Sequence, residues 1–183
     1  YQLIDWPAAT PLTFGWDGKT TFEQSQQIGV ANLEAAISRT QHDRPGEPIV
    51  AVGYSSSANV MVRELRALAA GGSPHTGDLS FVVIGNVNRP NGGIFVRPGF
   101  FGPVTVPILN ATFGIPAPTN SGTTINTQDI AIQYDGVADF PEYPLNVLAD
   151  VNALFGLVLI HPTYVKPKVD PPAKGSDAHP YGY

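Results

Sequence analysis

Cysteine is absent from this 183-residue sequence, so it contains neither a disulfide framework nor a cysteine-ligated zinc site. Charged residues are also scarce, at 14%, where roughly a quarter is usual in globular proteins. The ten Lys and Arg residues form no cluster and the net charge is −5. This excludes the basic footprint of a nucleic-acid-binding protein. We expect no metal, no cofactor and no nucleic-acid partner.

Long apolar runs are missing too, because no uninterrupted run approaches the roughly 18 residues of a membrane span. What is abundant is proline and glycine, at 18 and 19 residues, alongside 43% hydrophobic residues. This composition predicts one globular domain with long, ordered, rather apolar loops. It suits a protein that works against lipid or a cell envelope, although a loop-rich soluble enzyme has a similar composition. The chain begins at Tyr1 without an initiator Met, so a removed leader is compatible with it.

Strand and helix patterns alternate along the first half of the chain. The predicted order is strand, helix, strand, helix, strand, at residues 1–5, 20–39, 49–53, 58–70 and 79–85. Thr20 and Glu23 form a capping box that opens the first helix. The last strand is uniformly hydrophobic, which predicts cover on both of its faces. Together these patterns predict an α/β domain with a mostly parallel central sheet flanked by helices.

A long insertion at about 86–126 interrupts this alternation. It is rich in Gly, Pro, Asn and Thr, and aromatic residues are spread through it. A loop this long inside a compact domain is usually functional or disordered, and its aromatic content argues against disorder. We expect either a lid over the substrate or an extra hairpin packed on the body. Phe100 and Phe101 are its candidate substrate contacts.

The remaining chain contains a strand at 130–134, a helix at 144–155 and a short apolar segment at 157–160. Leu145, Leu148 and Leu154 are expected to face inward from the helix. Residues 1–165 therefore make up the predicted domain. Residues 166–183 carry Pro and Lys without periodicity, which is typical of an extended tail or linker.

One short motif is a candidate nucleophile turn. The strand at 49–53 ends in Gly53-x-Ser55-x-Ser57, a variant of the sharp strand-to-helix turn that exposes a reactive serine. Small flanking residues suit the strained backbone of such a turn. An ordinary strand–turn–helix with a serine helix cap explains the same residues equally well.

A carboxylate and a histidine follow this serine in the order that α/β-hydrolases use. Asp135 and Asp139 come after the predicted strand at 130–134, and His161 comes after the last apolar segment. Such sheets build their sites at the carboxyl ends of strands. A structural role is the alternative for His161, and Asp135 stands in an Asp-Gly pair that also suits a simple turn.

Several motifs occur in a fixed order: 53–58 (GYSSSA), 81–86 (FVVIGN), 90–93 (PNGG), 132–141 (IQYDGVADFP), 143–146 (YPLN), 148–150 (LAD) and 161–164 (HPTY). With this set the chain resembles the PE-PPE domain family, mycobacterial serine α/β-hydrolases related to cutinases, from about Tyr1 to Tyr164. The resemblance implies a cutinase-like α/β-hydrolase fold. It also implies activity on carboxylic esters.

The resemblance implies Ser55 as nucleophile and His161 as base. It favours Asp139 over Asp135, because cutinase-like enzymes carry their Asp in a Gly-Asp pair and Ala138-Asp139 is similar. The backbone N–H of Ser56 is the implied oxyanion donor, and Tyr54 is a further candidate substrate contact. Relatives have an earlier strand with a Gly-rich loop that supplies the second donor. We expect that strand to lie outside this sequence, or the loop at 6–10 to replace its donor.

Three functions follow as expectations. The first is an esterase or lipase that hydrolyses acyl esters, secreted or in the cell envelope. The second is an acyltransferase that moves acyl chains between envelope glycolipids such as acylated trehalose. The third is a catalytically silent envelope-binding module. The expected partners are an acyl ester or glycolipid substrate and, peripherally, envelope lipid.

Overall fold

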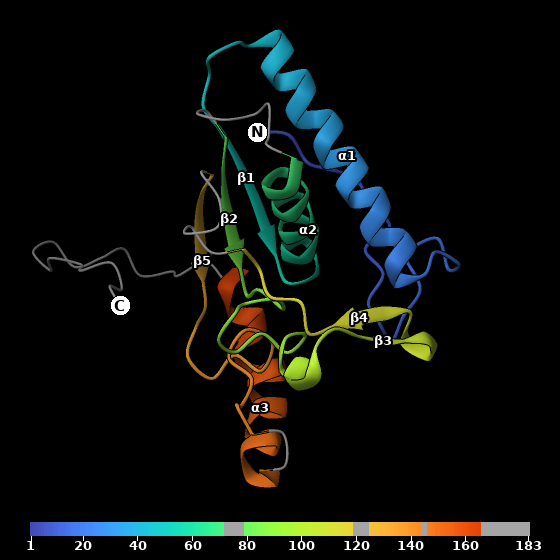
Figure 1. Ribbon diagram of the computed structural model, residues 1–183, viewed down its shortest axis with the longest axis vertical. Coiled ribbons are helices and arrows are strands. Elements are labelled where there is room, and N and C mark those ends of the chain that lie inside the picture. The colour runs from blue at the N-terminus through green and yellow to red at the C-terminus, as the bar shows by residue number, and fades with distance from the viewer. Residues whose placement is uncertain (72–78, 119–124, 144–145, 166–183) are drawn as a thin grey trace, which may run out of the picture.

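In the computed structural model, three parallel strands form the central sheet in the order β1-β2-β5 (Figure 1). The strands are β1 (Ile49–Tyr54), β2 (Leu79–Ile84) and β5 (Asn126–Ile130). Tyr54 pairs with Ile84, and Ile84 pairs with Ile130, so the carboxyl ends of all three strands lie side by side. The structure describes residues 1–71, 79–118, 125–143 and 146–165. The predicted α/β class with a parallel sheet is confirmed.

Two helices lie on one side of the sheet. Helix α2 (Ser56–Gly71) packs on β1 and β2, and helix α1 (Phe22–Asp43) packs on α2. The capping box of α1 is one residue later than predicted, because Thr21 caps Gln24 and Gln24 bonds back to Thr21. Arg63 of α2 also donates two hydrogen bonds of 2.8 Å to the carboxylate of Glu23 in α1. Packing and this ion pair fix the two helices together.

The main core lies between α2 and the sheet. Its fully buried members come from both layers and include Val62, Leu65, Phe81 and Val83. The opposite face of β1 exposes Val50 and Val52, at 57% and 58%. Two-sided cover was predicted for residues 79–85, and β2 is buried on one face but only half-buried on the other. The difference arises because α1 packs on α2 instead of on the second face.

The N-terminal residues differ from the prediction. Residues 1–9 form no strand, and β1 is an edge strand of the described sheet. Instead of pairing, the segment is tied to α1, where the Asn32 side chain donates to the Asp5 carbonyl oxygen at 2.7 Å. The three described strands are hydrogen-bonded neighbours, and the N-terminal segment is not part of their sheet.

The insertion at 86–126 contains a small antiparallel hairpin, β3 (Val104–Val106) and β4 (Ala111–Phe113). The short 3-10 helix η1 (Arg97–Phe101) precedes the hairpin, and a second one, η2 (Pro107–Leu109), connects its two strands. A second core cluster holds it against the body through five buried side chains: Phe22, Val87, Phe95, Ala111 and Val137. Of the two predicted alternatives, the packed hairpin is confirmed for the described part, and residues 119–124 lie outside it.

The last elements sit at the carboxyl ends of the strands. Helix α3 (Val147–Leu159) projects away from the sheet and is followed by the 3-10 helix η4 (His161–Val165) (Figure 1). The strand predicted at 130–134 was wrong in position, because β5 ends at Ile130 and a turn follows. Leu145 and the predicted tail at 166–183 lie outside the described residues.

Helix α3 is not the inward-facing helix that was predicted. Leu148 is 84% exposed and Leu154 60%, and the helix buries only Ala153 and Gly156. By length and composition alone, the 18-residue segment Val147–Tyr164 is apolar enough to cross a membrane, and 17% of it is buried. Polar residues interrupt this segment, so it contains no long uninterrupted apolar run.

Candidate active site

Ser55 occupies a sharp turn between β1 and α2. Its φ of 57° lies in the left-handed region, which a non-glycine residue adopts only where the surroundings enforce it. A Cβ on Gly53 would come within 2.6 Å of the Ser57 carbonyl oxygen, so only glycine fits there. The Ser57 hydroxyl accepts from the N–H of Tyr54 and donates to its carbonyl oxygen, both at 2.8 Å. Ser57 therefore stabilises the turn that exposes Ser55.

His161 is placed against this serine by the end of α3. Its Nε2 lies 2.8 Å from Ser55 Oγ, and its Nδ1 lies 3.0 Å from each carboxylate oxygen of Asp135. An ionised carboxylate only accepts hydrogen bonds, so Nδ1 carries the proton and Nε2 presents its lone pair to the serine hydroxyl. Asp135 is fully buried and His161 is 9% exposed. The three side chains form one continuous hydrogen-bonded chain.

Three donors converge on the Asp135 carboxylate. Besides His161, the N–H of Val137 donates to Oδ1 and the hydroxyl of Tyr164 donates to Oδ2, each at 2.8 Å. Burial opposes ionisation of Asp135, but these hydrogen bonds outweigh it and hold its pKa below the ordinary value. Asp135 is therefore ionised at neutral pH.

Asp139 does not take the position predicted for it. Its Oδ2 accepts from the N–H of Tyr134 at 2.8 Å, and its Oδ1 lies 3.9 Å from Arg89. Its own N–H donates to the Asp135 carbonyl oxygen at 2.7 Å. Asp139 thus closes the turn that carries Asp135, and Asp135 is the carboxylate that contacts His161. The choice of Asp139 from the similarity of Ala138-Asp139 to a Gly-Asp pair was wrong in geometry.

The signal for Asp135 was the glycine that follows it. A Cβ on Gly136 would lie 1.9 Å from the Ala153 carbonyl oxygen, and one on Gly156 would lie 1.9 Å from the Tyr134 carbonyl oxygen. The Asp135 turn and α3 therefore touch backbone to backbone. The Asp-Gly pair marks this close approach, which brings the carboxylate to the histidine at the end of α3.

The family is decided by the sequence as a whole. A family model described as the PE-PPE domain matches residues 1–179. This chain belongs to the PE-PPE domain family. The resemblance noted from its motifs is confirmed.

Curated relatives of this PE-PPE domain match it over part of their own length. Esterase PE16 of Mycobacterium tuberculosis is 44% identical over 163 residues, which are 85% of this chain and 29% of the relative. SL1278 acyltransferase Chp1 of the same organism is 37% identical over 135 residues, 73% of this chain and 30% of the relative. This chain thus spans less than a third of either protein. A cutinase-like protein from Cryptococcus sp. aligns with 22% identity and a TM-score of 0.43, covering 74% of this chain and 69% of that one.

Of the other predicted site residues of this PE-PPE domain, Tyr54 and Ser56 lie at the histidine and the turn. Tyr54 stacks on the His161 ring, with centroids 5.0 Å apart, and its hydroxyl donates to the His161 carbonyl oxygen at 2.6 Å. Ser56 is the first residue of α2, so its N–H lacks a carbonyl partner within the helix. Phe100 and Phe101 lie in η1, and their side chains fall outside the described part. Substrate contact and oxyanion binding stay predictions for these residues.

The loop at 6–10 reaches the serine turn of the PE-PPE domain through Ala9. The Ala9 carbonyl oxygen accepts from the Ser56 hydroxyl at 3.4 Å. The N–H of Ala9 donates to Ser25, and the N–H of Thr10 donates to Thr13. Both amides are therefore engaged elsewhere in this arrangement, and neither replaces the second oxyanion donor that the resemblance implies.

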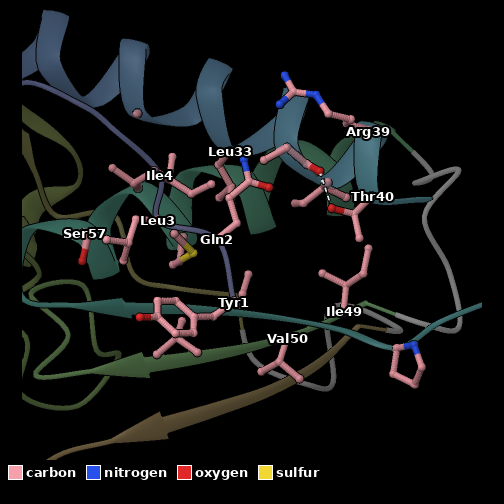
Figure 2. A pocket seen from close by; sticks show the side chains of 18 of the residues that line it. Tyr1, Gln2, Leu3, Ile4, Leu33, Arg39, Thr40, Ile49, Val50 and Ser57 are labelled. Atoms are coloured by element: carbon pink, nitrogen blue, oxygen red, sulfur yellow. Dashed lines mark hydrogen bonds between the residues drawn. The ribbon is translucent and has the colours of Figure 1, made fainter. Parts of the chain in front are cut away.

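A cavity of about 690 Å³ lies beside β1, between α1 and the N-terminal segment (Figure 2). Leu33 of α1, Val50 of β1 and Leu3 of the N-terminal segment line it, and Ser57 reaches it from α2. Ser55 and His161 do not line it. The hydrogen-bonded chain of Ser55, His161 and Asp135 in this PE-PPE domain therefore lies outside the cavity.

Proposed function

We propose that this PE-PPE domain hydrolyses carboxylic esters through an acyl-enzyme formed on Ser55. The observation that carries the proposal is the hydrogen-bonded chain from Ser55 Oγ through His161 to Asp135. A serine acts as a nucleophile when an adjacent base accepts its proton and a third group orients that base. The name of a similar protein, Esterase PE16, supports the same proposal.

The geometry supports the following sequence of steps. His161 Nε2 takes the Ser55 proton while Oγ attacks the ester carbonyl carbon, and Asp135 stabilises the resulting imidazolium. In the proposed mechanism, the N–H of Ser56 donates to the oxyanion of the tetrahedral intermediate. His161 then protonates the departing alcohol, which leaves an acyl group on Ser55. Water activated by the same base releases the carboxylic acid and restores the serine.

Covalent labelling tests this proposal on the unmodified chain. A fluorophosphonate probe is expected to react at a single serine, and peptide mass spectrometry is expected to locate the adduct on Ser55. The released acid is measured in parallel with a soluble nitrophenyl ester. Labelling of another serine would contradict the assignment of Ser55. No labelling together with no hydrolysis would favour the silent envelope-binding module instead.

Acyl transfer is a second candidate, favoured by the acyltransferase Chp1 among the similar proteins. The chemistry is the same until deacylation, when a sugar hydroxyl replaces water as the group activated by His161. Incubation with an acylated trehalose separates the two functions. A more highly acylated trehalose would support transfer, whereas free fatty acid as the sole acyl product would leave hydrolysis.

We also propose that the substrate is presented by a lipid surface, which α3 contacts. Its exposed apolar side chains are Val147, Leu148, Val151, Leu154, Phe155, Leu157, Val158 and Leu159. At 100° per residue they cover an arc of about 200°, wider than one packed helix face requires. A lipid phase can surround such an arc. Helix α3 alone is about 20 Å long, too short to span about 30 Å of hydrocarbon. The rest of the 18-residue apolar segment holds His161 against Asp135, so we place the helix at the lipid surface.

His161 follows α3 directly, which would hold the reacting groups at the lipid boundary. The sequence of α3 contains no basic residue, so apolar burial rather than attraction to anionic headgroups would drive the contact. An envelope location, predicted from composition and resemblance, fits this proposal.

Replacing both Leu154 and Phe155 by Ser is expected to weaken binding to vesicles of uncharged phospholipid at least tenfold, because each buried large side chain contributes about 1.5–3 kcal/mol. Cosedimentation measures the binding. Leu12 and Ile108 are 83% and 91% exposed away from α3, so their double Ser variant is the matched control. Equal losses in the two variants, or none in either, would contradict the α3 surface. Hydrolysis of a soluble ester should remain unchanged in both.

A further inference from the structure

Tyr164 lies directly behind the Asp135 carboxylate, and its hydroxyl is bonded on both sides. It donates to Asp135 Oδ2 at 2.8 Å and accepts from the N–H of Ile132 at 2.7 Å. Because the backbone N–H can only donate, the hydroxyl proton is directed to the carboxylate. The tyrosine is therefore a fixed donor rather than a freely rotating hydroxyl.

The local structure explains why this tyrosine and the histidine meet the same carboxylate. Both belong to η4, a 3-10 helix, in which residues three apart lie on one face. The ring centroids of His161 and Tyr164 are 6.0 Å apart. The spacing His161-x-x-Tyr164 thus delivers the base and a second donor to Asp135 from one short element.

We propose that Tyr164 is a positioning residue that orients Asp135 and sets how strongly the carboxylate supports a protonated His161. The proposal rests on the serine hydrolase function proposed above. A carboxylate that accepts a strong hydrogen bond from tyrosine has part of its charge compensated, so it stabilises an imidazolium less. Tyr164 therefore moderates the negative charge that Asp135 presents to His161 Nδ1.

The other groups around His161 do not act on the carboxylate in this way. Those that face the imidazole in the described chain are Ser55, Tyr54 and Asp135, and Asp135 is the charged one among them. Tyr54 donates to the His161 backbone, not to the carboxylate. Burial, together with the Asp135 charge, raises the pKa of Tyr54 and also that of Tyr164, so both remain neutral donors.

The Tyr164→Phe variant tests the proposal through the pH dependence of soluble-ester hydrolysis. The kcat is expected to fall about tenfold, as for loss of one hydrogen bond to a charged group, with KM unchanged. The acid limb of the rate profile is expected to move up by about half a pH unit, because the uncompensated carboxylate holds the imidazolium more strongly. Tyr143→Phe removes the hydroxyl of a tyrosine that is 70% exposed, so its acid limb should stay at the wild-type pH.

A second substitution gives the opposite sign and retains the hydrogen bonds. Difluorotyrosine incorporated at position 164 is a stronger donor, so its acid limb should move to lower pH than in the wild type. Opposite shifts in the two Tyr164 variants would support the proposal, even if Tyr164→Phe has lower thermal stability. An active wild type with an unmoved acid limb in both variants would overturn this inference alone. An inactive, unlabelled wild type would overturn the proposed function as well.

Discussion

Replacing Asp135 by Asn is expected to lower kcat about 10⁴-fold, the size of effect seen when the orienting carboxylate of a serine hydrolase becomes an amide. The Asn side chain offers two N–H donors in place of carboxylate oxygens, so it favours the tautomer of His161 that bears its proton on Nε2. That tautomer cannot accept the Ser55 proton. Steady-state hydrolysis of a soluble ester measures the loss.

The matched control for this variant is Asp139→Asn. Asp139 accepts from the N–H of Tyr134, and an Asn oxygen can accept the same hydrogen bond. We expect this variant to retain kcat within about tenfold, since one neutral hydrogen bond is worth about 1 kcal/mol. The reverse ranking of the two variants would restore Asp139 as the orienting carboxylate.

Replacing Gly85 by Ala is expected to lower kcat about 100-fold, the size of effect that a displacement of about 1 Å in an active site produces. Gly85 follows β2, and a Cβ on it would lie 2.8 Å from Cε1 and 3.2 Å from Nδ1 of His161. The imidazole must therefore shift away from Ser55, from Asp135, or from both. The kcat for a soluble ester and the rate of fluorophosphonate labelling should fall together.

Gly46→Ala separates this displacement from backbone strain. Gly85 and Gly46 both have positive φ, 56° and 82°, so alanine is strained at either position. Nothing lies within 4 Å of a Cβ on Gly46. Thermal unfolding should show similar destabilisation of the two variants, but only Gly85→Ala should lose activity. Equal activity in both would mean that the histidine accommodates the extra carbon.

Sequence patterns predicted the parts of the site that local chemistry determines. Gly53 and Ser57 mark the serine turn because the steric limit and the side-chain cap both act within five residues. His161 was found because it ends an apolar segment. Asp135 was named as a candidate but ranked below Asp139, because the choice between them depends on how α3 approaches the turn, which is a contact between segments distant along the chain.

Helix α3 shows a second limit of sequence patterns. An inward face is inferred from apolar residues that alternate with polar ones at helical spacing. In α3 apolar residues occupy most of the circumference, so the pattern does not indicate which face of the helix is buried. The choice of Leu148 and Leu154 as inward-facing residues was therefore wrong. The two small residues Ala153 and Gly156 make the contact instead, since only small side chains permit the close approach to the Asp135 turn.

The close contacts at Gly136 and Gly156 separate a part of the molecule whose sequence is constrained from a part whose sequence can change. Because backbone touches backbone there, the Asp135 turn and α3 form one unit that carries carboxylate and base together, while the sheet carries the serine. Beyond Gly85, the residues between β2 and β5 contribute none of the three side chains of the proposed triad. That stretch can diverge and change substrate preference during evolution, whereas the glycines constrain the spacing on which the chemistry depends.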